Sequence, residues 1–273
     1  VRMTNSTVEK SGYLGVAYRS FAVREDPNAA NFAVRALSMP SGAAAARSAA
    51  RTALLTDLDT AYRSMDLADQ NIAGMDRFYQ QAFDVLRSSR TREAFELSKE
   101  KPETRERYGR TSLGQACLLA RRLVQAGVRC VTIDYGSWDT HQRNFTMMKN
   151  ELLPTWDTAL AALLEDLDRH GLLESTLVWS TGEMGRTPTI NKDAGRDHWG
   201  KAMSMLLAGG GIQNGQVLGV TDQQGAEVVD GGVKPEDVAA TVLKVLGIDP
   251  RTEYEAAGRP ITAWIRSVEI RTL

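Results

Sequence analysis

The stretch LGQACLLARRLVQAGVRCVTIDYGSWDTH, residues 113–141, predicts a helix, then a strand, then a polar loop. Its apolar residues recur with helical spacing up to Ala126, and Gly127 follows as a residue type that commonly terminates helices. Residues 128–135 form a short β-branched run, which is typical of a buried strand. The stretch ends in Trp138-Asp139-Thr140-His141, so a carboxylate and an imidazole follow directly after the strand.

The same alternation continues toward the carboxyl end of the chain. Residues 152–171 and 235–247 have the spacing of helices, and residues 176–181 and 202–208 have the pattern of strands. Strands that alternate with helices of this length are typical of an α/β fold with a mostly parallel sheet. In such sheets, ligands gather beyond the carboxyl ends of the strands.

The amino-terminal part of the chain has a different character. Residues 1–42 carry scattered Gly, Pro and Asn with weak periodicity, so we expect an irregular segment. Residues 43–110 show helical stripes followed by a charged connection, which predicts a helical hairpin or cap. Residues 111–273 form the expected α/β core, and we expect one structural domain in all.

Composition limits the classes of function. The 33 basic residues against 34 acidic ones give a net charge of −1 without a basic stripe, which argues against nucleic acid as a partner. The apolar runs fall well short of the roughly 18 residues that a transmembrane segment needs. Cys117 and Cys130 predict two buried thiols, although a single bridge between them is left open. The polar start at Val1 is typical of a mature product or a fragment.

A second polar cluster follows the strand at residues 176–181. Gly182-Glu183-Met184-Gly185-Arg186 brings a carboxylate and a guanidinium to the strand end. Arg186 is suited to hold two oxygens of a phosphate or sulfate at once. The simpler interpretation of this pair alone is an ordinary salt bridge in a loop.

A third cluster, Arg196-Asp197-His198-Trp199, places a carboxylate beside an imidazole. Side chains of adjacent residues diverge in an extended segment, so either one binds a metal while the other orients a ligand, or the two serve two metals. The first cluster alone is also typical of a solvent-facing loop with a capping aspartate, and the His-Trp pair of the third is typical of a packed surface element. Together, His and acidic residues after successive strands predict a metal or oxyanion site, and these ligands suit zinc, manganese or iron.

Five stretches, taken in chain order, resemble the bacterial family catalogued as domain of unknown function 1501. They are WDTH at 138–141, ALAALLEDLDRHGLL at 159–173, GEMGRTP at 182–188, GRDHW at 195–199 and LAGGGI at 207–212. The resemblance covers nearly the whole chain, and the family is grouped with the alkaline phosphatase and sulfatase superfamily. It implies a doubly wound α/β fold in which helices sandwich a mostly parallel sheet.

The resemblance also implies one or two divalent metals, with zinc, manganese and calcium as alternatives, acting on a phosphate or sulfate ester. The ester would belong to a small molecule or a polysaccharide. By position, the resemblance implies Asp139, His141 and His198 as metal ligands, and with the nearby acidic residues the expected metal shell is Asp139, His141, Glu183, Asp197 and His198. Arg186 and Arg196 are expected to hold the oxyanion, because a fixed guanidinium stabilises charge that grows in the transition state.

The chain departs from the family pattern in two places. Glu183 stands where phosphatases and sulfatases usually carry an Asp-His pair. Residues 1–40 lack the Gly-Gly-Pro-Ser-like and Asp-rich segment in which the superfamily places its nucleophile. We therefore expect an amino-terminally truncated chain and assign no nucleophile. The export signal usual in the family implies a periplasmic or exported location.

Three functions fit these patterns. The leading hypothesis is a metal-dependent hydrolase of the alkaline phosphatase superfamily that acts on a phosphate or sulfate ester. Glu183 in place of the Asp-His pair favours an alternative, a non-catalytic exported binding or assembly protein that keeps the fold. A third is a metal-dependent phosphoryl transferase or mutase, because the fold alone does not choose among activities.

Overall fold

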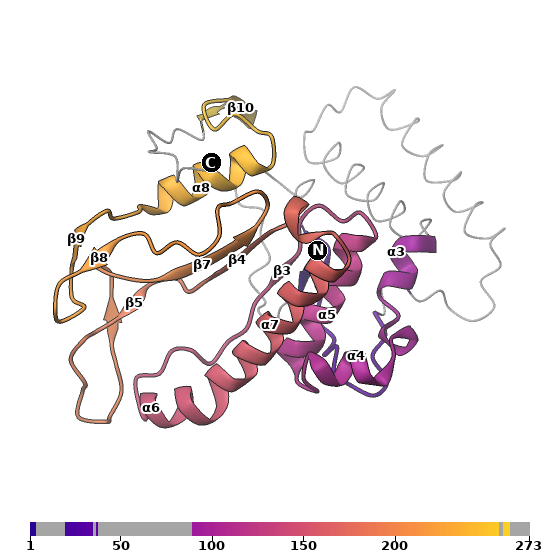
Figure 1. The fold of residues 1–273 in the computed structure, drawn as a ribbon, viewed down its shortest axis with the longest axis horizontal. Coiled ribbons are helices and arrows are strands. Elements are labelled where there is room, and N and C mark those ends of the chain that lie inside the picture. Colours follow the sequence, from indigo (N-terminus) through magenta and orange to yellow (C-terminus); the bar gives the residue numbers. More distant parts are fainter. Residues whose placement is uncertain (4–19, 35–36, 38–88, 257–258, 263–273) are drawn as a thin grey trace, which may run out of the picture. The chain divides into compact units, whose positions relative to one another are not determined.

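A computed structural model describes residues 1–3, 20–34, 37, 89–256 and 259–262, and Figure 1 shows its elements. The chain divides into two compact units. The first comprises residues 1–102 and 122–134, and the second comprises residues 103–121 and 135–273. Most of the predicted helical cap at 43–110 lies outside the described residues, so the cap stays a prediction.

A three-stranded parallel sheet organises the first unit. Its strands are β1 (Arg2–Met3), β2 (Ala22–Val23) and β3 (Thr132–Ile133), in the order β2-β1-β3. Two of them lie in the segment that the sequence predicts to be irregular. Strands of two residues are too short to show the alternation by which a strand is detected. β3 is likewise shorter than the predicted strand at 128–135, because only its centre pairs with β1.

Two short helices and the end of a longer one complete the first unit. They are α3 (Ser89–Ala94), η4 (Leu97–Lys99) and the last turn of α5 (Ser112–Gln125). The buried ring of Phe95 meets Phe21 edge-on, with centroids 6.0 Å apart. Arg122 donates to the carbonyl oxygen of Ala94 and pairs with Glu100 at 2.6 Å. These contacts fix the end of α5 to the segment that follows α3.

Helices dominate the first half of the second unit. They are α4 (Pro102–Arg107), most of α5, α6 (Asn144–Met147), the π-helical turn η5 (Met148–Leu152), α7 (Leu153–Arg169) and the 3-10 helix η6 (Leu173–Ser175). Figure 1 shows α6, η5 and α7 as one continuous helical rod. α7 confirms the helix predicted over this stretch and buries Ala159, Leu163 and Leu167 on one face.

A buried carboxylate ties α7 to its neighbours. Asp166 of α7 is 2% exposed and accepts hydrogen bonds from Tyr108 at 2.9 Å and Arg107 at 2.7 Å. The Nε atom of Arg121 lies 2.9 Å from the second carboxylate oxygen. Burial is the largest influence and raises the pKa of Asp166, but Tyr108, Arg121 and Arg107 together bring the pKa below its usual value. The ionised carboxylate therefore joins α7 to α5 and to the end of α4.

The longest strand pair of the second unit is antiparallel. β4 (Leu177–Thr181) pairs with β7 (Met205–Gly209), with Leu177 opposite Gly209. The mixed α/β class is confirmed, but the mostly parallel sheet is not: among the described residues, parallel pairing is confined to the first unit. The reason lies in residues 182–204, which contain no helix. A parallel return requires a crossover, usually a helix, whereas a chain without one returns antiparallel.

Shorter pairs and one helix complete the second unit. The pairs are β5 (Gly185–Arg186) with β6 (His198–Trp199), β8 (Val220–Thr221) with β9 (Val228–Asp230), and β10 (Glu253–Ala256) with β11 (Arg259–Thr262). α8 (Pro235–Val245) confirms the predicted helix, and Asp237 caps it by accepting the backbone N–H of Lys234 at 2.9 Å. Among the described residues, no helix combines the length and the apolar character needed to cross a membrane.

Both cysteines are free thiols. Cys117 is buried in α5, as expected, and burial raises the pKa of its thiol to about 12. Cys130 is exposed, so the expectation of a second buried thiol is wrong. The predicted strand would have buried Cys130, but β3 begins two residues after it and leaves it in the loop.

Candidate metal centre

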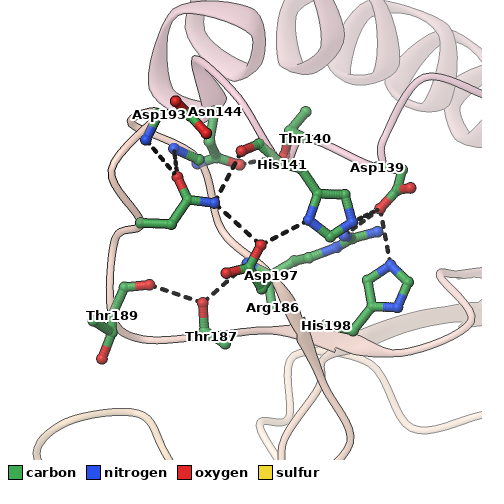
Figure 2. Close-up of polar contacts among 12 residues, drawn as sticks. Asp139, Thr140, His141, Asn144, Arg186, Thr187, Thr189, Asp193, Asp197 and His198 are labelled. Carbon is green, nitrogen blue, oxygen red and sulfur yellow. Dashed lines mark hydrogen bonds and ion pairs between the residues drawn. The ribbon is translucent and has the colours of Figure 1, made fainter.

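The three polar clusters of the sequence meet in the second unit. Asp139 and His141 lie in the loop before α6, Arg186 lies on β5, and His198 lies on β6. The antiparallel pairing of β5 with β6 sets Arg186 directly opposite His198. Figure 2 shows the side chains of these residues converging from the loop and from the strand pair.

Backbone hydrogen bonds fix the loop of Asp139 and His141 against the segment before β6. The N–H of Arg196 donates to the carbonyl oxygen of Thr140 at 3.1 Å, and the N–H of Asn144 donates to that of Ala194 at 2.9 Å. A Cβ atom on Gly195 would lie 1.9 Å from the carbonyl oxygen of His141. Only glycine allows the two segments to come this close.

Two imidazoles and one carboxylate form the centre of the site. The Nε2 atoms of His141 and His198 each lie 3.0 Å from Oδ1 of Asp139. The ligand atoms of the three residues all lie within 4.8 Å of one another. Two ligand atoms on a tetrahedral ion at 2.0–2.2 Å are about 3.4 Å apart, so binding of a cation would require Asp139 to move outward from the imidazoles and the widest separation in the group to shorten.

Asp197 contacts the centre from outside it. Its Oδ1 lies 2.8 Å from Nδ1 of His141 and accepts a hydrogen bond from Nδ2 of Asn191 at 3.1 Å. These two bonds, that of His141 first, hold the pKa of the Asp197 carboxyl below its usual range. An anionic carboxylate at Nδ1 favours the tautomer that carries its proton there, which leaves the lone pair of Nε2 free for a metal. Asp197 thus orients a ligand.

Arg186 pairs with the carboxylate of Asp139 through Nη1. Its Nη2 lies 3.5 Å from Oε1 of Glu183, so the guanidinium stands between two carboxylates. The hydrogen bond from Arg186 is the largest influence that lowers the pKa of Asp139, and that from His198 is the next. Glu183 therefore contacts Arg186 and stays outside the three-residue group.

Arg196 has other partners than Arg186. Its Nη1 donates to the carbonyl oxygens of Thr187 at 2.6 Å and of Pro188 at 3.0 Å. Its guanidinium carbon lies 5.4 Å from the ring centroid of Phe145. These contacts hold the loop after β5 against α6, and the expected oxyanion role of Arg196 stays a prediction.

One residue of the site was not found from the sequence. The side-chain amide of Asn191 donates to the carbonyl oxygen of His141 at 2.9 Å and to Asp197. Its Oδ1 accepts the N–H groups of Asp193 at 3.0 Å and Gly195 at 2.9 Å. An Asn side chain that accepts a hydrogen bond from the backbone two residues later forms an Asx turn. Asn191, followed by Gly195 four residues later, could therefore have predicted this turn from the sequence. The contacts to His141 and Asp197 had no such local signal.

The centre is open to solvent. Asp139 is 59% exposed, His198 is 50% exposed and His141 is 42% exposed at their side chains. The three carboxylates of Asp139, Glu183 and Asp197 outnumber the one guanidinium between them, so the cluster carries surplus negative charge. Such a surplus attracts a cation and repels an anionic ester that arrives without one.

Fold and site together define a mixed α/β protein with an exposed cluster of two histidines and one aspartate suited to a divalent cation. The chain belongs to the family described as protein of unknown function DUF1501, whose model matches residues 2–268. Neither the comparison with curated proteins nor the comparison with solved structures gives a match. Membership in this family therefore does not assign an activity to the chain.

Proposed function

We propose that this protein is a metal-dependent hydrolase of phosphate or sulfate esters, with a fold related to that of the alkaline phosphatase and sulfatase superfamily. The observation that carries the proposal is that the Nε2 atoms of His141 and His198 each lie 3.0 Å from the same carboxylate oxygen of Asp139. Three protein ligands leave a coordination position open, which is typical of catalytic rather than structural metal sites.

The ligand set narrows the choice of metal. Two imidazole nitrogens and one carboxylate suit zinc, manganese or iron, whereas calcium prefers a shell made of oxygens alone. A bound divalent cation would supply Lewis acidity toward an ester oxygen and would lower the pKa of a bound water. The surplus of carboxylates over guanidinium groups around Asp139 favours its binding.

The residues around the centre have separate roles in this proposal. Asp197 holds the ring of His141 by the bond to Nδ1, and Asn191 holds Asp197. Arg186, only 18% exposed, is placed to donate to the oxygens of an ester once Asp139 turns to a cation. In the net reaction, a water oxygen bonds to phosphorus or sulfur, the bond to the ester oxygen breaks, and the alcohol leaves with one proton from that water.

Metal analysis of the purified full chain tests the ligand set. We expect about one zinc or manganese ion per chain after loading and dialysis, as a single three-ligand site holds one ion. Asp139→Asn and His198→Ala should each lose most of this metal by inductively coupled plasma mass spectrometry. His170→Ala is the matched control, because His170 contacts the backbone of Asp166 on α7 and lies outside the cluster. Equal metal content in all four proteins would rule out this site.

One observation favours the alternative of a non-catalytic binding or assembly protein. Arg186 already neutralises Asp139, so the carboxylate has a partner without any metal. A panel of aryl and alkyl phosphates and sulfates, assayed with added zinc and manganese, separates the two proposals. Turnover that His141→Ala and His198→Ala abolish excludes the alternative. A metal-loaded protein that turns over no ester of the panel supports it.

A periplasmic or exported location also stays a proposal, drawn from the family resemblance alone. Fractionation of cells that express the natural full-length protein tests it. Recovery of the protein in the cytoplasmic fraction with its amino terminus unprocessed would contradict it.

A further inference from the structure

An apolar groove of about 560 Å³ is lined by residues of α6, η5 and α7. Its apolar lining consists of Phe145, Met148, Leu153, Pro154 and Trp156. Phe145 is 51% exposed and Leu153 is 42% exposed, although both side chains are large and apolar. Apolar side chains gathered at one exposed site are typical of a surface that binds a partner or ligand.

The groove begins beside the candidate metal centre. Phe145 follows Asn144, whose N–H donates to the carbonyl oxygen of Ala194 in the segment leading to Asp197. The guanidinium carbon of Arg196, the residue before Asp197, lies 5.4 Å from the centroid of the Phe145 ring. The first aromatic ring of the groove is thus fixed against the segment that carries Asp197 and His198.

One wall of the groove, formed by Trp156, is held in place before any ligand arrives. Nε1 of Trp156 donates to Oγ of Ser180 on β4 at 3.1 Å, which fixes the indole. The turn η5 is a π-helix, a form that occurs mostly as short insertions in α-helices, frequently at functional sites. Side chains that are already fixed lose little conformational entropy when they bind a ligand.

We propose that this groove holds the organic group of the ester, so that the substrate is a monoester of an aryl or alkyl alcohol. The inference rests on the proposed function for the anionic end of that substrate, which would lie at Arg186 and the centre. Lys149 and Asp157 in the lining offset each other in charge, and the guanidinium of Arg196 lies at the Phe145 end, which is the end nearest the centre. Five of the seven lining residues are apolar, which favours an apolar group over a sugar.

Binding of 2-naphthol, the alcohol of an aryl ester, tests the groove separately from the metal centre. Isothermal titration of the full chain should give saturable binding, and Phe145→Ala and Leu153→Ala should each weaken it about tenfold or less, as loss of roughly 50 Å² of apolar contact implies. His198→Ala should bind 2-naphthol as wild type does. Val217→Ala is the matched control, since this valine is 94% exposed and lies outside the groove. Circular dichroism checks that each variant is folded.

A second arm uses esters on the metal-loaded protein. The ratio of kcat/KM for 2-naphthyl phosphate or sulfate to that for the methyl ester should exceed about ten and should fall in Phe145→Ala. The proposed role of the groove is contradicted if 2-naphthol does not bind. It is also contradicted if the methyl ester, glucose 6-phosphate and the naphthyl ester have equal kcat/KM. If 2-naphthol binds in the groove but the protein binds no metal and turns over no ester, the hydrolase proposal is contradicted and the groove remains a binding site for aryl alcohols.

Discussion

The Nδ1 atom of His141 lies 2.8 Å from Oδ1 of Asp197, while Nε2 of the same ring lies 3.0 Å from Oδ1 of Asp139. One imidazole therefore stands between two carboxylates that have different tasks (Figure 2). The carboxylate at Nδ1 sets the tautomer and the ring orientation, and the carboxylate at Nε2 is a partner in the proposed metal shell. Several consequences of this arrangement are measurable.

Substitution of Asp197 by Asn should weaken metal binding without unfolding the protein. The variant keeps the shape of the side chain but loses the anion that favours a proton on Nδ1 of His141, and such changes typically cost about 10- to 100-fold in metal affinity. Competition with a chromogenic chelator measures the affinity. Asp193→Asn, in the same loop but exposed, is the control. An unchanged affinity in Asp197→Asn would mean that Asp197 does not orient His141.

Substitution of Arg186 by Gln should separate metal binding from turnover. The pKa of Asp139 should rise toward its usual value, because the bond from Arg186 is the largest influence that lowers it. Metal affinity should stay the same or increase, since a competing cation is gone, while kcat should fall by about 10²- to 10³-fold if Arg186 stabilises the transition state. Arg251→Gln serves as control, because Arg251 pairs with Asp249 outside the cluster. Loss of metal with kcat unaffected per bound ion would contradict the assigned role.

Replacement of Gly195 by Ala should disturb the site through sterics alone. The new Cβ would meet the carbonyl oxygen of His141 at 1.9 Å, so the loop must move. We expect a loss of about 1–3 kcal/mol in the free energy of unfolding, as for other overpacked positions, together with weaker metal binding. Urea denaturation provides the measurement. Gly200→Ala is a matched control, because nothing lies within 4 Å of its Cβ. Equal stability of the two variants would show that the close approach is not rigid.

Substitution of Asp166 by Asn should destabilise the protein in a pH-dependent way. A carboxyl whose pKa is lower in the folded state stabilises the fold above its unfolded-state pKa of about 3.9, and this stabilisation is lost as the pH falls through the folded-state pKa. The deficit of the variant should therefore be about 3–5 kcal/mol near neutral pH, as for a broken buried ion pair, and should shrink in acid. Urea titrations at several pH values measure it. Asp168→Asn, exposed on the same helix, should show neither effect; a deficit that grows in acid would contradict the expected sign.

The two thiols should react at very different rates. Burial raises the pKa of Cys117 to about 12, so its thiolate is scarce and shielded, whereas Cys130 is exposed. Ellman's reagent should modify Cys130 in the native protein and reach Cys117 only in denaturant. The variant Cys130→Ser identifies which thiol reacts. Rapid reaction of that variant under native conditions would contradict the burial of Cys117.

Three helices, α5, α7 and α8, were predictable from local patterns, whereas α4 lies in the stretch that was expected to be a charged connection. The expected helix at 113–126 matches α5, and those at 152–171 and 235–247 match α7 and α8 to within a few residues. Each has an apolar face with regular spacing, and Gly127, Gly171 and Gly247 follow their ends with positive φ. Such signals depend only on residues close together in the sequence, and these are the signals that a single chain carries clearly.

Strand pairing and the division of roles within the site were less accessible. Nothing local distinguishes β4 and β7 as antiparallel partners except the absence of a helix between them. The sequence predicted that Asp139, His141 and His198 serve one site, and the structure brings these residues together. It did not separate Asp197, which orients His141, or Glu183, which pairs with Arg186, from the group. The role of Asp197 depends on a contact between residues 56 positions apart, which no periodicity encodes, whereas the Glu183–Arg186 pair is a local contact for which a loop salt bridge was the simpler interpretation.

The pairing of β5 with β6 has a mechanical consequence. Each strand is two residues long, so the ladder that sets Arg186 opposite His198 contributes little stability of its own. An ion shared by His198 on β6 and by Asp139 and His141 in the loop before α6 would act as a cross-link between these segments, much as a clip closes a loop. We expect residues 187–197 to be cut early by a protease in the metal-free protein and to resist cutting once zinc is added. Limited proteolysis with mass spectrometry would then report metal occupancy without any substrate.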